Sequence, residues 1–155
     1  MKYWLGAAVL AACVVLSGCS TSSQVQQAHS GLQGRSFDYW FTNRGGENAE
    51  GIAELDRVIQ NRLLRAGFVG NGAASGKVDV TLTHYYVRHG AARALVGIMA
   101  GRDKIISHVR VTDTSGALLT AFEVESTNAT AWGTTGGLHE KHAEEIAAQL
   151  QSNRQ

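Results

Sequence analysis

The stretch Lys104–Ser126, KIISHVRVTDTSGALLTAFEVES, decides the fold. Two runs in which apolar residues alternate with polar ones flank Asp113–Gly116, whose residue types favour a tight reversal of the chain. This pattern predicts a β-hairpin. Placing Val111 opposite Leu118 gathers the apolar side chains of both runs on one face, so we expect that face to pack on a core.

Two further strands are predicted upstream of this hairpin. The segment Lys77–His89 alternates between apolar and polar residues, which is typical of a strand with one buried face. Its predicted buried residues are Val78, Val80, Leu82 and Tyr86. The aromatic, roughly alternating segment Arg35–Phe41 is the second predicted strand, and the Gly45-Gly46 pair ends it.

Two helices are predicted from apolar residues at helical spacing. The first covers Asn48–Ala66, and Gly67 directly after it suits a left-handed helix cap. The second covers Leu138–Leu150. The residues that these two stripes place toward a core are Ile52, Leu55, Ile59, Leu63 and Ala66 in the first helix, and Leu138, His142, Ile146 and Leu150 in the second.

The resulting order, β-α-β-β-β-α, predicts an α+β domain. We expect a largely antiparallel sheet of about four strands with both helices on one face, because that arrangement buries every apolar stripe. Residues 35–152 are expected to form one domain, since a chain of this length supplies one core but hardly two.

The N-terminal residues have the pattern of an export signal. Lys2 is followed by the apolar run Trp4–Leu16, which is too short to cross a bilayer as a helix. The residues Leu16-Ser17-Gly18-Cys19 resemble the lipobox of bacterial lipoproteins. That resemblance implies cleavage after residue 18, so that 1–18 is a signal peptide, and acylation of Cys19, which would anchor the chain to a lipid bilayer. The alternative is an ordinary secretory signal with a chance cysteine.

The sequence after Cys19 predicts the membrane to which the lipoprotein is sorted and a linker to the domain. In lipoproteins of this type, a serine at the position of Ser20 implies the outer membrane, with the domain in the periplasm, and makes the inner membrane less favoured. The polar stretch Ser20–Gly34 predicts a flexible tether, so residues 19–34 are interpreted as lipidated cysteine plus tether.

Charge and cysteine content exclude other classes. The 14 Lys and Arg residues include Lys2, so the chain after residue 18 has 13 basic and 13 acidic residues and no net charge with neutral histidines. A general attraction to nucleic acid is therefore not expected. No disulfide is expected either, because Cys13 lies in the signal peptide and Cys19 would carry lipid.

Four short motifs carry a family resemblance: Leu63–Phe68 (LLRAGF), Lys77–Leu82 (KVDVTL), Gly97–Arg102 (GIMAGR) and Val109–Gly116 (VRVTDTSG). Together they resemble the DUF4410 family of bacterial lipoproteins. The resemblance implies a layout similar to the curli-secretion channel lipoprotein and to lipoproteins that activate peptidoglycan synthases, which act through protein partners. It implies no catalytic residues.

The sequence gives little support for a catalytic site or a metal site. His139 and His142 lie three residues apart, but the metalloprotease pattern needs two residues after the glutamate and this sequence has one. Ser75 and Ser115 lie in turn sequences and do not match a nucleophile elbow. We therefore expect no metal site, no cofactor and no enzymatic activity, and we interpret the histidines as surface or core-edge residues.

The segment 90–101 is the best candidate for an interaction surface. It is rich in small residues and carries Leu95, Val96, Ile98 and Met99. Apolar residues gathered in this way mark contacts with partners when they are exposed, and the alternative is a strand extension buried on the core. The resulting hypothesis is a non-enzymatic lipoprotein that binds an envelope protein partner or itself. An envelope hydrolase or small-ligand-binding protein is the alternative.

Overall fold

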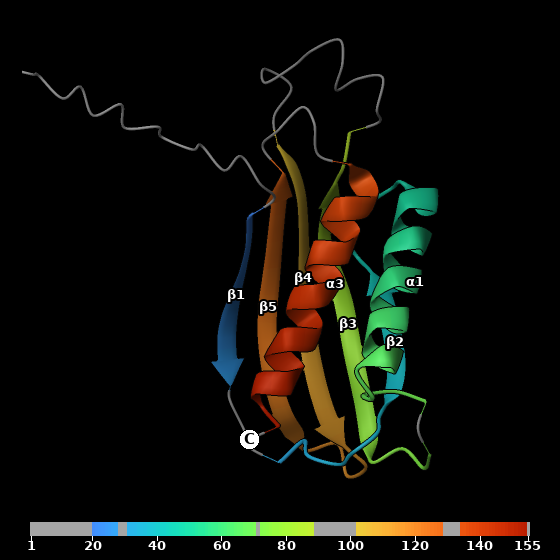
Figure 1. The fold of residues 1–155 in the computed structure, drawn as a ribbon, viewed down its shortest axis with the longest axis vertical. Coiled ribbons are helices and arrows are strands. Elements are labelled where there is room, and N and C mark those ends of the chain that lie inside the picture. Colours follow the sequence, from blue (N-terminus) through green and yellow to red (C-terminus); the bar gives the residue numbers. More distant parts are fainter. Residues whose placement is uncertain (1–19, 28–30, 71, 89–101, 129–133, 155) are drawn as a thin grey trace, which may run out of the picture.

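The fold is a five-stranded sheet with two helices against one face (Figure 1). A computed structural model describes residues 20–27, 31–70, 72–88, 102–128 and 134–154. Its elements are β1 (Ser20–Gln27), β2 (Asp38–Asn43), α1 (Ala49–Arg65), β3 (Gly76–Tyr86), β4 (Asp103–Asp113), β5 (Leu118–Asn128) and α3 (Thr135–Ser152). The strands lie in the order β1-β5-β4-β3-β2, which confirms the α+β class and adds one strand to the predicted set.

The predicted hairpin is β4 and β5. The Asp113 carboxylate accepts hydrogen bonds from the backbone N–H of Ser115 (2.8 Å) and of Ala117 (3.0 Å), and these bonds hold the turn. The register differs from the prediction, because Val111 lies opposite Thr120 and an irregularity follows it. Side chains alternate with a period of two, so this slip of two residues leaves the same face buried.

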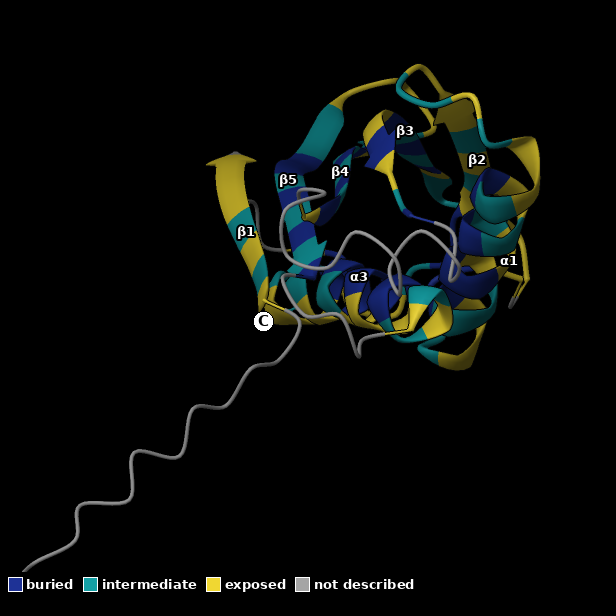
Figure 2. Cartoon of the chain, turned by 90° about the horizontal axis from the view of Figure 1, so that it is seen from above, coloured by how far each residue is buried: buried dark blue, intermediate teal, exposed yellow. Residues whose placement is uncertain are grey.

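The structure has a strand, β1, where part of a flexible tether was predicted. Ser20–Gln27 is not a flexible linker but an edge strand, antiparallel to β5 from Ser20 opposite Thr127 to Gln27 opposite Ala121. Its side chains are mostly exposed, as the outer strand in Figure 2 shows. Its polar sequence therefore suits its place, because the backbone ladder to β5 and not side-chain burial holds it.

The strand on the opposite edge also differs in detail from the prediction. β2 covers Asp38–Asn43 and pairs with β3 in parallel, since α1 connects the two strands as a crossover. All other strand pairs of the described chain are antiparallel, which confirms the largely antiparallel sheet, although the pair of β1 with β5 was not predicted.

The alternation in β3 breaks after Leu82. The pairing with β4 shifts between Leu82 and His84, so Tyr85 is buried and Tyr86 is 49% exposed, which reverses the prediction for Tyr86. A close backbone approach accompanies this shift. A Cβ on Gly45 would collide with the backbone of Thr83, so only glycine fits at that position.

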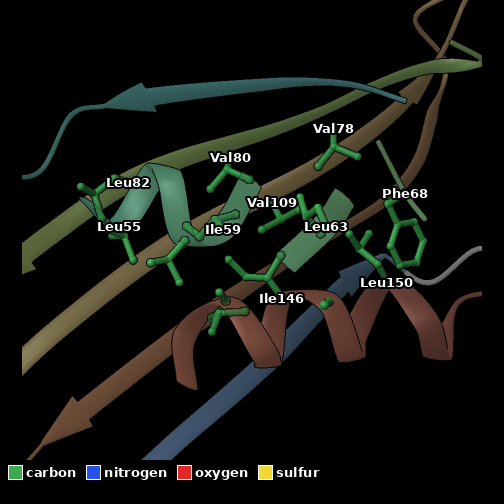
Figure 3. Packing of buried hydrophobic residues seen from close by; sticks show 14 of the residues in the cluster. Leu55, Ile59, Leu63, Phe68, Val78, Val80, Leu82, Val109, Ile146 and Leu150 are labelled. Atoms are coloured by element: carbon green, nitrogen blue, oxygen red, sulfur yellow. The ribbon is translucent and has the colours of Figure 1, made fainter. Parts of the chain in front are cut away.

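The core lies between one face of the sheet and the two helices, and Figure 3 shows its centre. The predicted stripes of both helices are confirmed, except that Ala66 is only partly buried. Gly67 caps α1 with a φ of 71°, and the N–H of Phe68 donates to the Leu63 carbonyl at 2.9 Å. This is the glycine-based cap that the sequence predicted. No helix in the described part of the chain is long and apolar enough to cross a membrane.

Candidate functional site

Five predicted site residues lie outside the described residues: Cys19, Leu95, Val96, Ile98 and Met99. The structure does describe the residues that flank them. Ser20 begins β1, and Arg88 and Asp103 lie on either side of the apolar segment. The surroundings of these flanking residues define the candidate site.

We call this region the loop end of the domain. It consists of the last residues of β3 and β5, the first residues of β1 and β4, and the N-termini of α1 and α3 (Figure 1). The strand register supports this grouping, since Tyr86 lies opposite Lys104, Lys104 opposite Thr127, and Thr127 opposite Ser20. The other end of the sheet carries the β4–β5 turn.

A buried ion pair at the loop end joins Arg88, two residues after the end of β3, to Asp103, the first residue of β4. The Arg88 Nε lies 2.9 Å from Asp103 Oδ1, and the Arg88 backbone N–H donates to the same oxygen at 3.0 Å. The two side chains are 4% and 0% exposed. A buried pair of this kind adds little net stability, but loss of one partner leaves an uncompensated charge. The pair joins Arg88 and Asp103, which lie on either side of segment 89–101.

A tyrosine and a histidine are in contact near this ion pair, around the same cavity as Arg88. The Tyr85 hydroxyl lies 3.0 Å from His139 Nε2, and the two rings are 5.9 Å apart at an angle of 45°. Burial lowers the pKa of His139, and the nearby Glu54 carboxylate opposes this effect. Both residues line an open cavity of about 320 Å³ with Asn48, Glu50, Gly51, Glu54, Val87, Arg88, Thr135 and Gly136.

The second core histidine bridges two strands. His142 Nδ1 lies 2.9 Å from Ser126 Oγ on β5, and its Nε2 lies 2.9 Å from Ser107 Oγ on β4. All three residues are fully buried. Burial, with a smaller contribution from His139, lowers the pKa of His142 from 6.5 to about 3. A neutral imidazole has one donor and one acceptor, which matches a bridge between two hydroxyls.

These contacts place both helix histidines in the core. His139 and His142 have different partners and both are buried, which confirms the core-facing position predicted for His142 and excludes a surface position for these two residues. Ser107 and Ser126 do not form a catalytic triad with His142, because no carboxylate orients the imidazole and no substrate reaches fully buried hydroxyls. Among the described residues, no group of three or more His, Cys, Asp or Glu could hold a metal ion.

Sequence reasoning missed the Arg88–Asp103 pair. The available signal was weak: an arginine and an aspartate on either side of an apolar insertion, 15 residues apart. Arg88 and Asp103 come into contact only because β3 and β4 are antiparallel neighbours in the sheet.

Comparison with known families supports the resemblance. The sequence profile of the domain of unknown function DUF4410 matches residues 52–131, which run from α1 through β5. The chain belongs to the DUF4410 family. The DUF4410 match includes the buried ion pair and segment 89–101. A search of the curated proteins found no match.

Solved structures share the fold. Two crystal structures of PelC from Paraburkholderia phytofirmans are similar to this DUF4410 chain. A singly substituted PelC dodecamer in space group C2 has 12% sequence identity and a TM-score of 0.57, and the PelC dodecamer in space group P6 has 10% identity and a TM-score of 0.58. Each alignment covers 86% of this chain and 98% of the PelC chain. At such low identity the likeness establishes the fold and nothing more about function.

Proposed function

We propose that this DUF4410 chain is a lipid-anchored envelope protein that functions by binding copies of itself and does not catalyse a reaction. One observation carries the proposal: the same fold, over 98% of the PelC chain, occurs in structures described as dodecamers. A different envelope protein as partner is the second candidate.

The use of the histidines supports a non-enzymatic role. His142 is occupied by two serines in the core and is neutral at any physiological pH, because its pKa is lowered to about 3. His139 contacts the Tyr85 hydroxyl. Groups of this type would be the first choice for acid–base catalysis near neutral pH, and here they stabilise the packing of α3 on the sheet.

The proposed binding surface is the segment that carries Leu95, Val96, Ile98 and Met99. The Arg88–Asp103 pair supports this assignment, because it closes the ladder of β3 and β4 where the segment begins and ends. The segment is thus an insertion between β3 and β4, which are neighbours in the sheet. Apolar side chains in such an insertion suit a contact with another protein.

The anchor is proposed to be acylated Cys19, in the outer membrane and with the domain in the periplasm. Mass spectrometry of the N-terminal peptide from the membrane-extracted protein tests this part. A diacylglycerol-modified Cys19 at the N-terminus is the expected result. An unmodified Cys19, or a chain that retains residues 1–18, would contradict it.

The binding surface is tested with a photo-crosslinking amino acid in intact cells. It is placed at Leu95 and, as a matched control, at Thr114, which is exposed in the turn at the other end of the domain. The proposal predicts a ladder of multiples of the chain from position 95 and none from position 114. A different envelope protein at position 95 would favour the second candidate, and intramolecular products alone would refute the surface.

A further inference from the structure

The cysteine proposed to carry lipid has no tether. Cys19 is joined by one peptide bond to Ser20, which is the first residue of β1 and lies opposite Thr127 of β5. Consecutive Cα atoms are about 3.8 Å apart. A flexible tether of about 15 residues would instead have a root-mean-square length of about 20 Å and would let the domain rotate freely.

The first strand is also fixed to the rest of the domain through side chains. Gln149 Nε2 of α3 donates to Ser23 Oγ at 2.6 Å, and the Ser126 hydroxyl on β5 lies 3.5 Å from Thr21 Oγ1. Together with the backbone ladder to β5, these contacts attach β1 to both layers of the fold. A force on Cys19 is therefore transmitted directly to the sheet.

The start of β1 belongs to the loop end. Ser20 shares this end with Tyr86, Asp103 and Asn128, as the register of the antiparallel strands requires. β4 and β5 have 11 residues each. At about 3.3 Å per residue, the β4–β5 turn lies about 36 Å from the loop end.

We propose that the loop end of the domain faces the bilayer and that the β4–β5 turn points away from it. This inference rests on the proposed acylation of Cys19, and it names the surface that lies against the lipid headgroups. Two residues exposed there have suitable side chains. Arg102 is exposed and Tyr86 is 49% exposed, and arginine and tyrosine both suit the headgroup region.

Anchoring at one end also restricts the symmetry of self-association. If every copy presents its loop end to the same bilayer, all copies have their strands pointing the same way relative to the membrane. Such copies assemble around an axis along the membrane normal, as a cyclic ring, and cannot form the head-to-head pairs of a dihedral assembly.

The test uses the full-length lipoprotein in vesicles of phosphatidylethanolamine and phosphatidylglycerol that contain a lipid with a nitroxide on its headgroup. Cys13 lies in the signal peptide and Cys19 is blocked by its thioether, so one added cysteine carries a fluorescent label. The labelled positions are Arg102→Cys at the loop end and Thr114→Cys at the turn. Both positions are exposed, so neither substitution disturbs the core.

Nitroxide quenching requires near contact, so we expect loss of fluorescence from the label at 102 and none from the label at 114. Insertion of a Gly/Ser linker of about 15 residues between Cys19 and Ser20 should remove the difference. Equal quenching at the two positions, or stronger quenching at 114, would overturn the orientation. Mass spectrometry of the same sample separates the two proposals: acylated Cys19 with equal quenching refutes only the orientation, and unmodified Cys19 refutes both.

Discussion

Lowering the pH from 7 to 5 should destabilise the folded domain through His142. Its pKa is lowered from 6.5 to about 3 in the folded state, chiefly by burial. The unfolded chain therefore binds a proton between these two pH values and the folded domain does not. The contribution is fully present above pH 6.5 and is lost as the pH falls toward 3, because protons stabilise the unfolded state.

The magnitude follows from the two pKa values. Between pH 7 and pH 5 the free energy of unfolding should fall by about 2 kcal/mol from this group, because an unfolded histidine with a pKa of about 6.5 becomes almost fully protonated over that range. His139 contributes in the same direction, since burial lowers its pKa as well.

The assay is urea unfolding followed by circular dichroism, on a chain that begins at Ser20. The control replaces the whole hydrogen-bonded set with apolar residues, Ser107→Ala, Ser126→Ala and His142→Leu, because removal of both partners avoids unsatisfied buried groups. The pH dependence of the control should be smaller than that of the natural chain by about 2 kcal/mol. Equal pH dependence in the two proteins would refute the assignment of a neutral, buried His142.

Three other substitutions test the described contacts by the same unfolding assay. Asp103→Ala should lower the free energy of unfolding by about 3–5 kcal/mol, because it removes the carboxylate that pairs with the buried Arg88. Loss of an exposed pair such as Glu54–Arg57 should lower it much less. Equal losses would contradict the burial of the Arg88–Asp103 pair. Gly45→Ala should cost about 1–3 kcal/mol, since a Cβ collides with backbone there; an unchanged stability would mean that the approach to β3 is looser than described. Tyr39→Phe should cost about 1 kcal/mol by removing the 2.7 Å hydrogen bond to Asp56, and a neutral result would count against that bond.

Much of the fold follows from local patterns in the sequence. Both helices were predicted because their apolar residues recur at helical spacing, and the hairpin because alternation flanks a turn sequence. Even the wrong register of the hairpin left the right face buried, since a slip of two residues preserves the alternation.

The missed features depend on contacts between distant parts of the chain. β1 has a polar sequence without a clear alternation, and only the free edge of β5, about 100 residues later, makes it a strand. The Arg88–Asp103 pair and the bridge from His142 to Ser107 and Ser126 need neighbouring strands and a helix above them. The parallel pairing of β2 likewise depends on how α1 crosses the sheet.

The candidate site could be predicted only in part. The sequence indicated the apolar segment with Leu95 and the lipidation signal at Cys19, and both stay predictions. It did not indicate that Ser20 and the residues flanking the segment, Arg88 and Asp103, lie at the same end of the domain, because this relation depends on the strand that was expected to be a tether.

The most direct test of self-association is the mass of the full-length lipoprotein, extracted from membranes in mild detergent and measured by native mass spectrometry. We predict one closed assembly of many copies of the chain, as in the PelC dodecamers, that dissociates when Leu95→Asp is introduced while the circular dichroism of the folded domain is unchanged. A single chain at every protein concentration would contradict the proposed function.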